Sequence, residues 1–172
     1  GACCARNQAI ELASGVFIAN LDDDDYFEPD RISKLLAAFG AGHSAVTSHD
    51  GFFTNQGRTR IWKKKRLITH DDLLYKNRAG NAFLTKKSYL TSIGGFDESL
   101  RAAQDHDVFV RLAKSHGPVS TVPVVLHNID DEASNVRITT SSVKWIGYYD
   151  FYCKHKVDMN SAQRGSNIYV IL

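Results

Sequence analysis

Residues 16–29 read VFIANLDDDDYFEP, an apolar run that leads directly into four consecutive aspartates, Asp22 to Asp25. The apolar residues do not alternate strictly with polar ones, which is typical of a strand covered on both faces, as in the parallel sheets of α/β proteins. We therefore expect a strand over residues 16–21. Open α/β sheets bind ligands beyond the carboxyl ends of their strands, where these aspartates would lie.

Four adjacent carboxylates repel one another and attract a cation. Hard oxygen ligands suit Mg or Mn, and a metal held by one or two carboxylates keeps positions open for substrate phosphates. The aspartate run therefore indicates a metal-assisted phosphate or nucleotide site. It lacks the alternating spacing and central glycine of a calcium-binding loop. A two-metal phosphohydrolase or nuclease usually draws His and Asp ligands from several strand ends, and the sequence shows no such scatter.

Three segments resemble family 2 glycosyltransferases of the GT-A fold, in the order in which that family carries them. The segment LDDDDYFEPDRI resembles the family's Asp-X-Asp motif, and ARNQAIELASG resembles its Ala-Arg-Asn helix. The segment GGFDESLRAAQDHDVFVRL resembles the family's Gly-Gly-Phe-Asp segment, which is followed by the acidic acceptor motif. The resemblance implies an α/β fold for residues 1–128, a partial GT-A, Rossmann-like mixed sheet flanked by helices. Residues 129–172 would form a C-terminal loop and helix extension.

The chain enters a helical pattern within its first residues, with no strand before it. GT-A domains open with strands that carry part of the nucleotide pocket. The resemblance therefore implies that the chain lacks the N-terminal part of the domain. A truncated, non-catalytic GT-A remnant or binding module stays open as the alternative to an enzyme.

The resemblance implies metal-dependent, inverting transfer of a sugar from a nucleotide-diphosphate donor to an acceptor hydroxyl, in polysaccharide or glycoconjugate synthesis. Asp24 closes the Asp-X-Asp triplet and is the expected ligand of Mn or Mg. Asp22 and Asp23 would contact the donor or support the metal, and Asp25 would be a spare. Arg6 is a candidate contact to the donor phosphate, although a solvated surface arginine explains it equally well.

Two further residues are candidates for the chemistry. Asp105 matches the family's catalytic base, and Gln104 replaces the Glu that usually precedes it. From the residues alone, an acidic side chain in the first turn of a helix is explained by the helix dipole. His127, expected just after a strand over residues 119–126, is a candidate metal ligand or diphosphate contact. A lone histidine is, however, more often structural or exposed.

The amino-acid composition limits which binding partners and which cellular compartment we expect. The chain has 172 residues, the size of one domain, and its 43% hydrophobic and 23% charged residues are ordinary for a soluble globular protein. A net charge of +2 gives no reason to expect nucleic acid. Three cysteines without metal-ligand spacing favour a reducing cytoplasm. We expect a carbohydrate or lipid-linked acceptor. Peripheral contact with the inner face of the membrane stays open as a possibility, and the sequence does not indicate an oligomeric state.

Local patterns predict the remaining elements. The predicted helices are one that ends before Gly15, one after Pro29, one over residues 87–93 and one that begins at residue 104. We also expect a hairpin over residues 51–62, a strand over residues 79–85 and a capping box at Thr69 and Asp72. An aromatic-rich helix is expected over residues 142–155, and we expect it to dock on the domain. RTRIWKKKR, residues 58–66, fits a mobile basic loop that meets an anionic partner. An edge strand kept from aggregating by its lysines is the simpler interpretation.

Overall fold

The computed structural model describes residues 1–131 and 144–171. Its helices are α1 (Ala2–Leu12), α2 (Arg31–Ala38), α3 (His70–Tyr75), α4 (Lys87–Ser92), α5 (Gln104–His116), α6 (Lys144–His155) and α7 (Ser161–Ile171). Its strands are β1 (Phe17–Ala19), β2 (Tyr26–Phe27), β3 (Ala45–Thr54), β4 (Gly57–Trp62), β5 (Leu67–Ile68), β6 (Leu84–Lys86) and β7 (Val119–Asp130).

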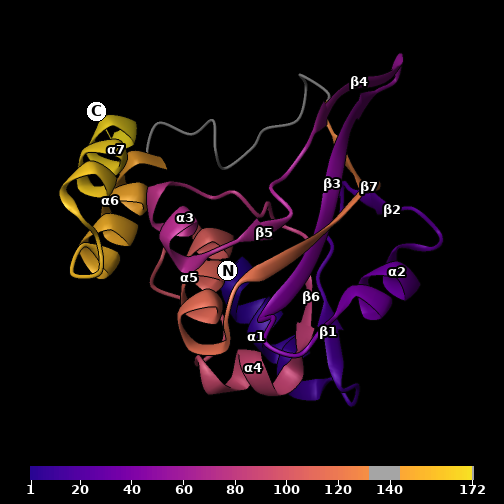
Figure 1. Ribbon diagram of the computed structural model, residues 1–172, viewed down its shortest axis with the longest axis horizontal. Coiled ribbons are helices and arrows are strands. Elements are labelled where there is room, and N and C mark those ends of the chain that lie inside the picture. The colour runs from indigo at the N-terminus through magenta and orange to yellow at the C-terminus, as the bar shows by residue number, and fades with distance from the viewer. Residues whose placement is uncertain (132–143, 172) are drawn as a thin grey trace.

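The described strands form one mixed sheet in the order β1-β6-β3-β7-β2, with β4 paired to β3 and β5 to β7. The long central strands β3 and β7 run parallel, and every other pairing is antiparallel. Helices flank this sheet (Figure 1). The predicted fold class, an α/β mixed sheet flanked by helices, is confirmed.

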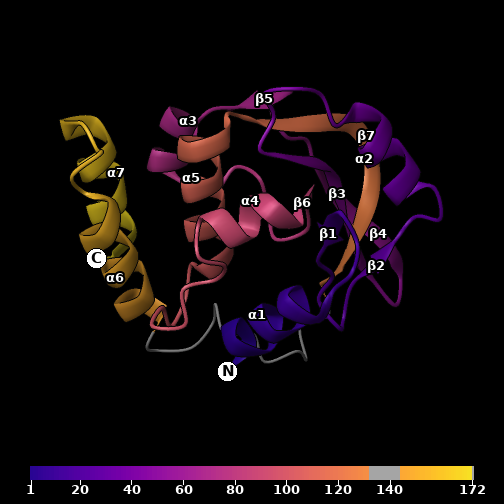
Figure 2. The same ribbon diagram turned by 90° about the horizontal axis from the view of Figure 1, so that it is seen from below.

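Alternating residues of the central strand β3 pack into two different cores. Ala45 belongs to the larger core, which includes residues of α1, α3, α4 and α5. Val46 points to the other face and packs with Leu35 of α2 and with Leu84 of β6. The sheet is therefore covered by helices on both faces, and α2 is the only described helix on one of them (Figures 1 and 2).

The strand predicted over residues 16–21 is wrong in extent and in burial. β1 contains only Phe17–Ala19 and pairs antiparallel with β6, at the end of the described strand order. Val16 is 72% exposed and Leu21 47% exposed. A strand paired along one side only leaves its flanking side chains without neighbours to cover them. The chain nevertheless passes directly from β1 into the aspartates.

Local turn and cap predictions fare better. The capping box is confirmed, because the Asp72 backbone N–H donates to Thr69 Oγ1 at 3.1 Å and the Thr69 N–H donates to Asp72 Oδ2 at 3.0 Å. The predicted hairpin is confirmed as β3 and β4, with Thr54 paired to Gly57 next to the turn. The strand predicted over residues 79–85 is mostly wrong, since β6 begins only at Leu84.

The predicted docking of the aromatic-rich helix on the domain is confirmed. Phe151 of α6 is buried and stacks on His106 of α5, with ring centroids 4.1 Å apart. The second C-terminal helix, α7, was not predicted, and it is held by polar groups instead. Gln163 donates to Asp71 Oδ1 at 2.7 Å, and Asn167 donates to the Leu74 carbonyl at 2.8 Å.

Much of the predicted C-terminal loop, residues 132–143, lies outside the described residues. None of the described helices combines the length and the apolar character needed to cross a bilayer.

A glycine in α6 allows that helix to lie against the segment before α5. A Cβ at Gly147 would meet the Ala102 backbone nitrogen at 2.4 Å, whereas a Cβ at Gly165 in α7 would meet nothing within 4 Å. We expect Gly147→Ala to lower the free energy of unfolding by about 1–3 kcal/mol through overpacking. Gly165→Ala is the matched control and should raise it by about 0.5–1 kcal/mol. Urea unfolding of both variants checks this, and equal effects would contradict it.

Candidate active site

Four aspartates, residues 22–25, form the acidic loop between β1 and β2. The loop is closed by a turn in which the Asp25 backbone N–H donates to the Asp22 carbonyl at 3.2 Å. The side chains divide into two kinds. Asp23 and Asp24 are exposed and line a cleft, whereas Asp22 and Asp25 are anchored to the protein.

Asp22 is held by side chains from two distant segments. Arg6 of α1 donates to its Oδ1 at 2.7 Å, and Asn81 donates to its Oδ2 at 2.7 Å. Asn81 is itself tied to the chain after β1, because Asn20 donates to the Asn81 carbonyl. Arg6 therefore lies beside the acidic loop, where its contact is a carboxylate. Its contact with a donor phosphate stays a prediction.

Asp25 is an internal anchor of the acidic loop and not a spare carboxylate at its surface. Its side chain is only 3% exposed. Asn81 donates to its Oδ2 at 3.3 Å, and the Asp130 backbone N–H donates to its Oδ1 at 3.2 Å. The same Oδ2 lies 3.0 Å from His127 Nε2. These bonds fix the inner end of the loop to β7.

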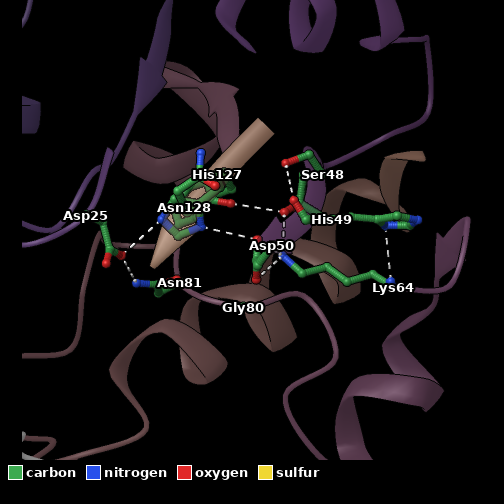
Figure 3. Close-up of polar contacts among 12 residues, drawn as sticks. Asp25, Ser48, His49, Asp50, Lys64, Gly80, Asn81, His127 and Asn128 are labelled. Carbon is green, nitrogen blue, oxygen red and sulfur yellow. Dashed lines mark hydrogen bonds and ion pairs between the residues drawn. The ribbon is translucent and has the colours of Figure 1, made fainter. Parts of the chain in front are cut away.

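Behind the acidic loop, four buried charged groups form a chain from Asp25 to Lys64 (Figure 3). His127 Nδ1 lies 3.1 Å from Asp50 Oδ1, and Lys64 Nζ lies 2.8 Å from each oxygen of Asp50. The side chains of Asp50, Lys64 and His127 are fully buried. Within this chain, two carboxylates contact two groups that can carry positive charge, His127 and Lys64.

The contacts of His127 determine its protonation. Carboxylates only accept hydrogen bonds, so both ring nitrogens donate, one to Asp25 and one to Asp50. Burial lowers the pKa of His127, but the hydrogen bonds to Asp25 and Asp50 outweigh it and raise the pKa above its usual value. The pKa of Asp50 is lowered, because its bonds to His127 and Lys64 outweigh the opposing effect of burial.

The predicted position of His127 is wrong, and its predicted metal ligation finds no support. β7 extends to Asp130, so His127 lies inside the strand and not after its end. Both of its nitrogens are engaged by carboxylates, which leaves neither free for a metal. His127 is placed to orient Asp25.

Asp105 lies in the first turn of α5, which follows a strained residue. Ala103 has a φ of 59°, in the left-handed region that non-glycine residues rarely adopt and that costs roughly 1–2 kcal/mol. Asp105 Oδ1 is buried and accepts no hydrogen bond from the described residues; Arg6 lies 3.9 Å away. Burial raises the pKa of Asp105 to about 6; Arg6 opposes this rise and Asp22 adds to it.

One cleft brings these groups together. It has a volume of about 780 Å³ and is lined both by the acidic loop and by Asp105. Arg6 connects the two sides, since it contacts Asp22 and Asp105. The expectation that Asp105 and the acidic loop face the same cleft is therefore confirmed, and their roles stay predictions.

The C-terminal helices form a wall of the cleft that the sequence did not indicate. Tyr148 and Phe151 of α6 and Asn167 and Val170 of α7 line it. No motif marks these residues, and only the aromatic content of α6 hints at a buried face.

α6 is also fastened electrostatically to the helix that carries Asp105. The buried Asp107 accepts from Lys154 Nζ and His155 Nε2 of α6, each at 2.8 Å, and from Arg111 Nε at 2.8 Å. Burial raises the pKa of Asp107, but these three hydrogen-bonded partners outweigh it and hold the pKa well below its usual range.

Comparison with known proteins gives matches over nearly the whole chain. The model of the family "Glycosyl transferase family 2" matches residues 1–102, and that of "Glycosyltransferase like family 2" matches residues 55–169. The putative colanic acid biosynthesis glycosyl transferase WcaA of Escherichia coli K12 is 31% identical over 99% of the chain. The chain spans 63% of that relative's length. Chondroitin synthase of Escherichia coli is 27% identical over 72% of the chain and 18% of its own length.

Two solved structures share the fold. Residues 1–349 of Staphylococcus aureus TarS, in complex with UDP-GlcNAc, give a TM-score of 0.65 at 16% identity over 92% of this chain and 48% of that fragment. The Pyrobaculum calidifontis mannosyltransferase PcManGT, in complex with GDP-Man and Mn²⁺, gives a TM-score of 0.55 at 18% identity. The match covers 80% of this chain and 37% of the mannosyltransferase chain.

Proposed function

The chain belongs to the family 2 glycosyltransferases, and we propose on that basis that it transfers a sugar from a nucleotide-diphosphate donor to an acceptor hydroxyl, with a divalent metal and with inversion. The observation that carries this proposal is the single cleft lined by the acidic loop and by Asp105. The donors named with TarS and PcManGT, UDP-GlcNAc and GDP-Man, support a nucleotide sugar. The name of the Escherichia coli relative supports a role in polysaccharide synthesis.

The free carboxylates of the acidic loop fit a divalent metal. Asp23 and Asp24 are exposed in the cleft and have no partner among the described residues. No group of three or more His, Cys, Asp or Glu within residues 1–131 and 144–171 is arranged to hold an ion by itself. This donor set suits Mn or Mg bound through Asp24, supported by Asp23, with donor phosphates and water as further ligands. When bound, such an ion stabilises the negative charge that develops on the leaving diphosphate.

Asp105 is the proposed general base. Its carboxylate takes the proton of the acceptor hydroxyl while that oxygen bonds to the anomeric carbon and the bond to the diphosphate breaks. Because the nucleophile and the leaving group lie on opposite sides of that carbon, the configuration inverts. A pKa of about 6 leaves Asp105 ionised at neutral pH and makes it a stronger proton acceptor than an ordinary aspartate.

Arg6 and Asp22 would support the same reaction by positioning the groups on the two sides of the cleft. The ion pair of 2.7 Å between them connects α1 to the acidic loop, and Arg6 also approaches Asp105. We propose that Asp22 contacts the donor and that Arg6 sets the spacing between the donor side and the base, with its remaining donors available for a donor phosphate.

Removing Asp24 tests the donor site. We expect Asp24→Ala to weaken manganese-dependent binding of a nucleoside diphosphate about tenfold or more, because an open metal ligand is lost. Asp30→Ala, which also removes an exposed carboxylate, is the matched control and should change that affinity less than about twofold. Calorimetric titration of UDP and GDP, with and without manganese, measures both. Failure of the unmodified chain to bind any nucleoside diphosphate would favour a non-catalytic module.

A further inference from the structure

Besides Arg6, which belongs to the proposed donor site, the cleft is lined by two cations that this site does not use. Arg6, Lys76 and Arg101 all line it. Arg6 is already paired with Asp22 and Asp105. Lys76 and Arg101 are exposed, and no acidic side chain within residues 1–131 and 144–171 pairs with either of them. An anionic ligand would supply the missing partner.

Contacts of the C-terminal helices place the segment that carries Lys76 next to α7 and the segment that carries Arg101 next to α6. Lys76 follows α3 and Arg101 precedes α5. Asn167 of α7 donates to the Leu74 carbonyl at 2.8 Å, which fixes α7 to the end of α3. Gly147 allows α6 to lie against the backbone immediately after Arg101. The wall beside α6 and α7 therefore carries positive charge, whereas the wall formed by the acidic loop carries negative charge.

The same wall presents aromatic rings. Tyr75, which precedes Lys76 in the chain, and Tyr148 of α6 line the cleft, and Trp62 of β4 lines it as well. A pyranose ring has apolar C–H faces that pack against aromatic rings, and binding sites commonly combine such rings with a few polar groups. Gln104, next to Asp105, adds a neutral amide and no negative charge. Together these groups match a sugar ring that bears an anionic substituent.

We propose that this wall binds an acidic saccharide as the acceptor, with its ring against Tyr75 and Tyr148 and its carboxylate or phosphate paired with Arg101 and Lys76. The assignment of this saccharide as acceptor rests on the proposed function. The binding of the saccharide itself does not depend on donor chemistry, so it can be measured separately.

The test uses three disaccharides that share one backbone and carry a hydroxyl, a carboxylate or a phosphate at C6 of the terminal ring. Calorimetric titration of the 172-residue chain should show at least one anionic disaccharide binding about tenfold tighter than the neutral one at low ionic strength. Added salt should narrow this difference. The tighter of the two anionic ligands identifies the group that the site recognises.

Charge-matched variants test whether Lys76 and Arg101 cause the preference for anionic disaccharides. The double variant Lys76→Ala/Arg101→Ala should reduce the preference for the anionic ligand to about twofold or less. Arg66→Ala/Lys156→Ala removes the same charges at exposed positions outside the cleft lining and should keep the preference. Tyr148→Ala should weaken all three disaccharides alike.

Three results would overturn the proposal: equal affinity for all three disaccharides, a preference that survives in the Lys76/Arg101 double variant, or no binding at millimolar concentration. Manganese-dependent nucleotide binding is measured in parallel, and the double variant should retain it within about twofold. A chain that binds acidic saccharides but no nucleotide would contradict the proposed transfer while supporting the saccharide site.

Discussion

Replacing Asp105 with asparagine should lower turnover about 10²–10⁴-fold and leave nucleotide affinity within about twofold, because the amide cannot accept the acceptor's proton. The carboxylate is available to accept that proton, since its Oδ1 is buried, no donor within residues 1–131 and 144–171 bonds to it, and Arg6 is 3.9 Å away. Turnover is measured by release of nucleoside diphosphate from a nucleotide sugar in the presence of saccharide. Unimpaired turnover would remove Asp105 as the base.

The pH dependence provides a second check on Asp105. Its pKa of about 6 predicts that the activity of the unmodified chain falls as the pH drops through about 6, where the base becomes protonated. Ionisation of Asp105, which favours activity, has the opposite effect on the stability of the fold. A carboxyl whose folded-state pKa lies above its unfolded value makes the fold less stable once it ionises, so Asp105→Asn should be at least as stable at pH 7.

Asp107, two residues further along the same helix, supplies the contrast. It is buried against Lys154, His155 and Arg111, and its pKa is held low, so its charge stabilises the fold at neutral pH. Asp107→Asn should therefore lower the free energy of unfolding by about 1–3 kcal/mol. A loss of stability in Asp105→Asn as large as that in Asp107→Asn would indicate a structural role for Asp105 instead.

Replacing Lys64 with methionine should lower the free energy of unfolding by about 3–5 kcal/mol, because it removes one of the two cationic groups that contact the buried Asp50. Lys64 Nζ lies 2.8 Å from both oxygens of Asp50 and 3.2 Å from Thr47 Oγ1. Burial lowers the pKa of Lys64 to about 8, and Asp50 opposes this fall, so Lys64 is still charged at pH 7. Methionine has a similar length, which isolates the loss of charge.

The neighbouring Lys63 is the control for this variant. It is exposed, so Lys63→Met should change stability by less than about 0.5 kcal/mol. Urea unfolding at low and high salt measures both variants. The Lys64 effect should persist at high salt, since buried pairs are only weakly screened. Similar losses for Lys63 and Lys64 would contradict the buried ion pair.

Several elements could be predicted because their signals lie within a few residues. The capping box at Thr69 needs only Asp72, and the helix that begins at Gln104 needs only its own apolar stripe. The sequence also predicts a chemistry for the candidate site: a run of carboxylates attracts a cation, and the resemblance to the family singles out Asp24 and Asp105. Their roles stay predictions until the variants are measured.

The tertiary structure alone decided which similar residues are buried. Three consecutive lysines follow Trp62, and only Lys64 is buried, because Asp50, 14 residues away on the paired strand β3, contacts it. Likewise, His127 joins Asp50 over 77 residues and Asp25 over 102. Caps and amphipathic stripes depend on neighbours three or four positions apart, so the sequence determines them directly. A buried charge is stable only beside its counter-charge, and folding alone brings distant partners together.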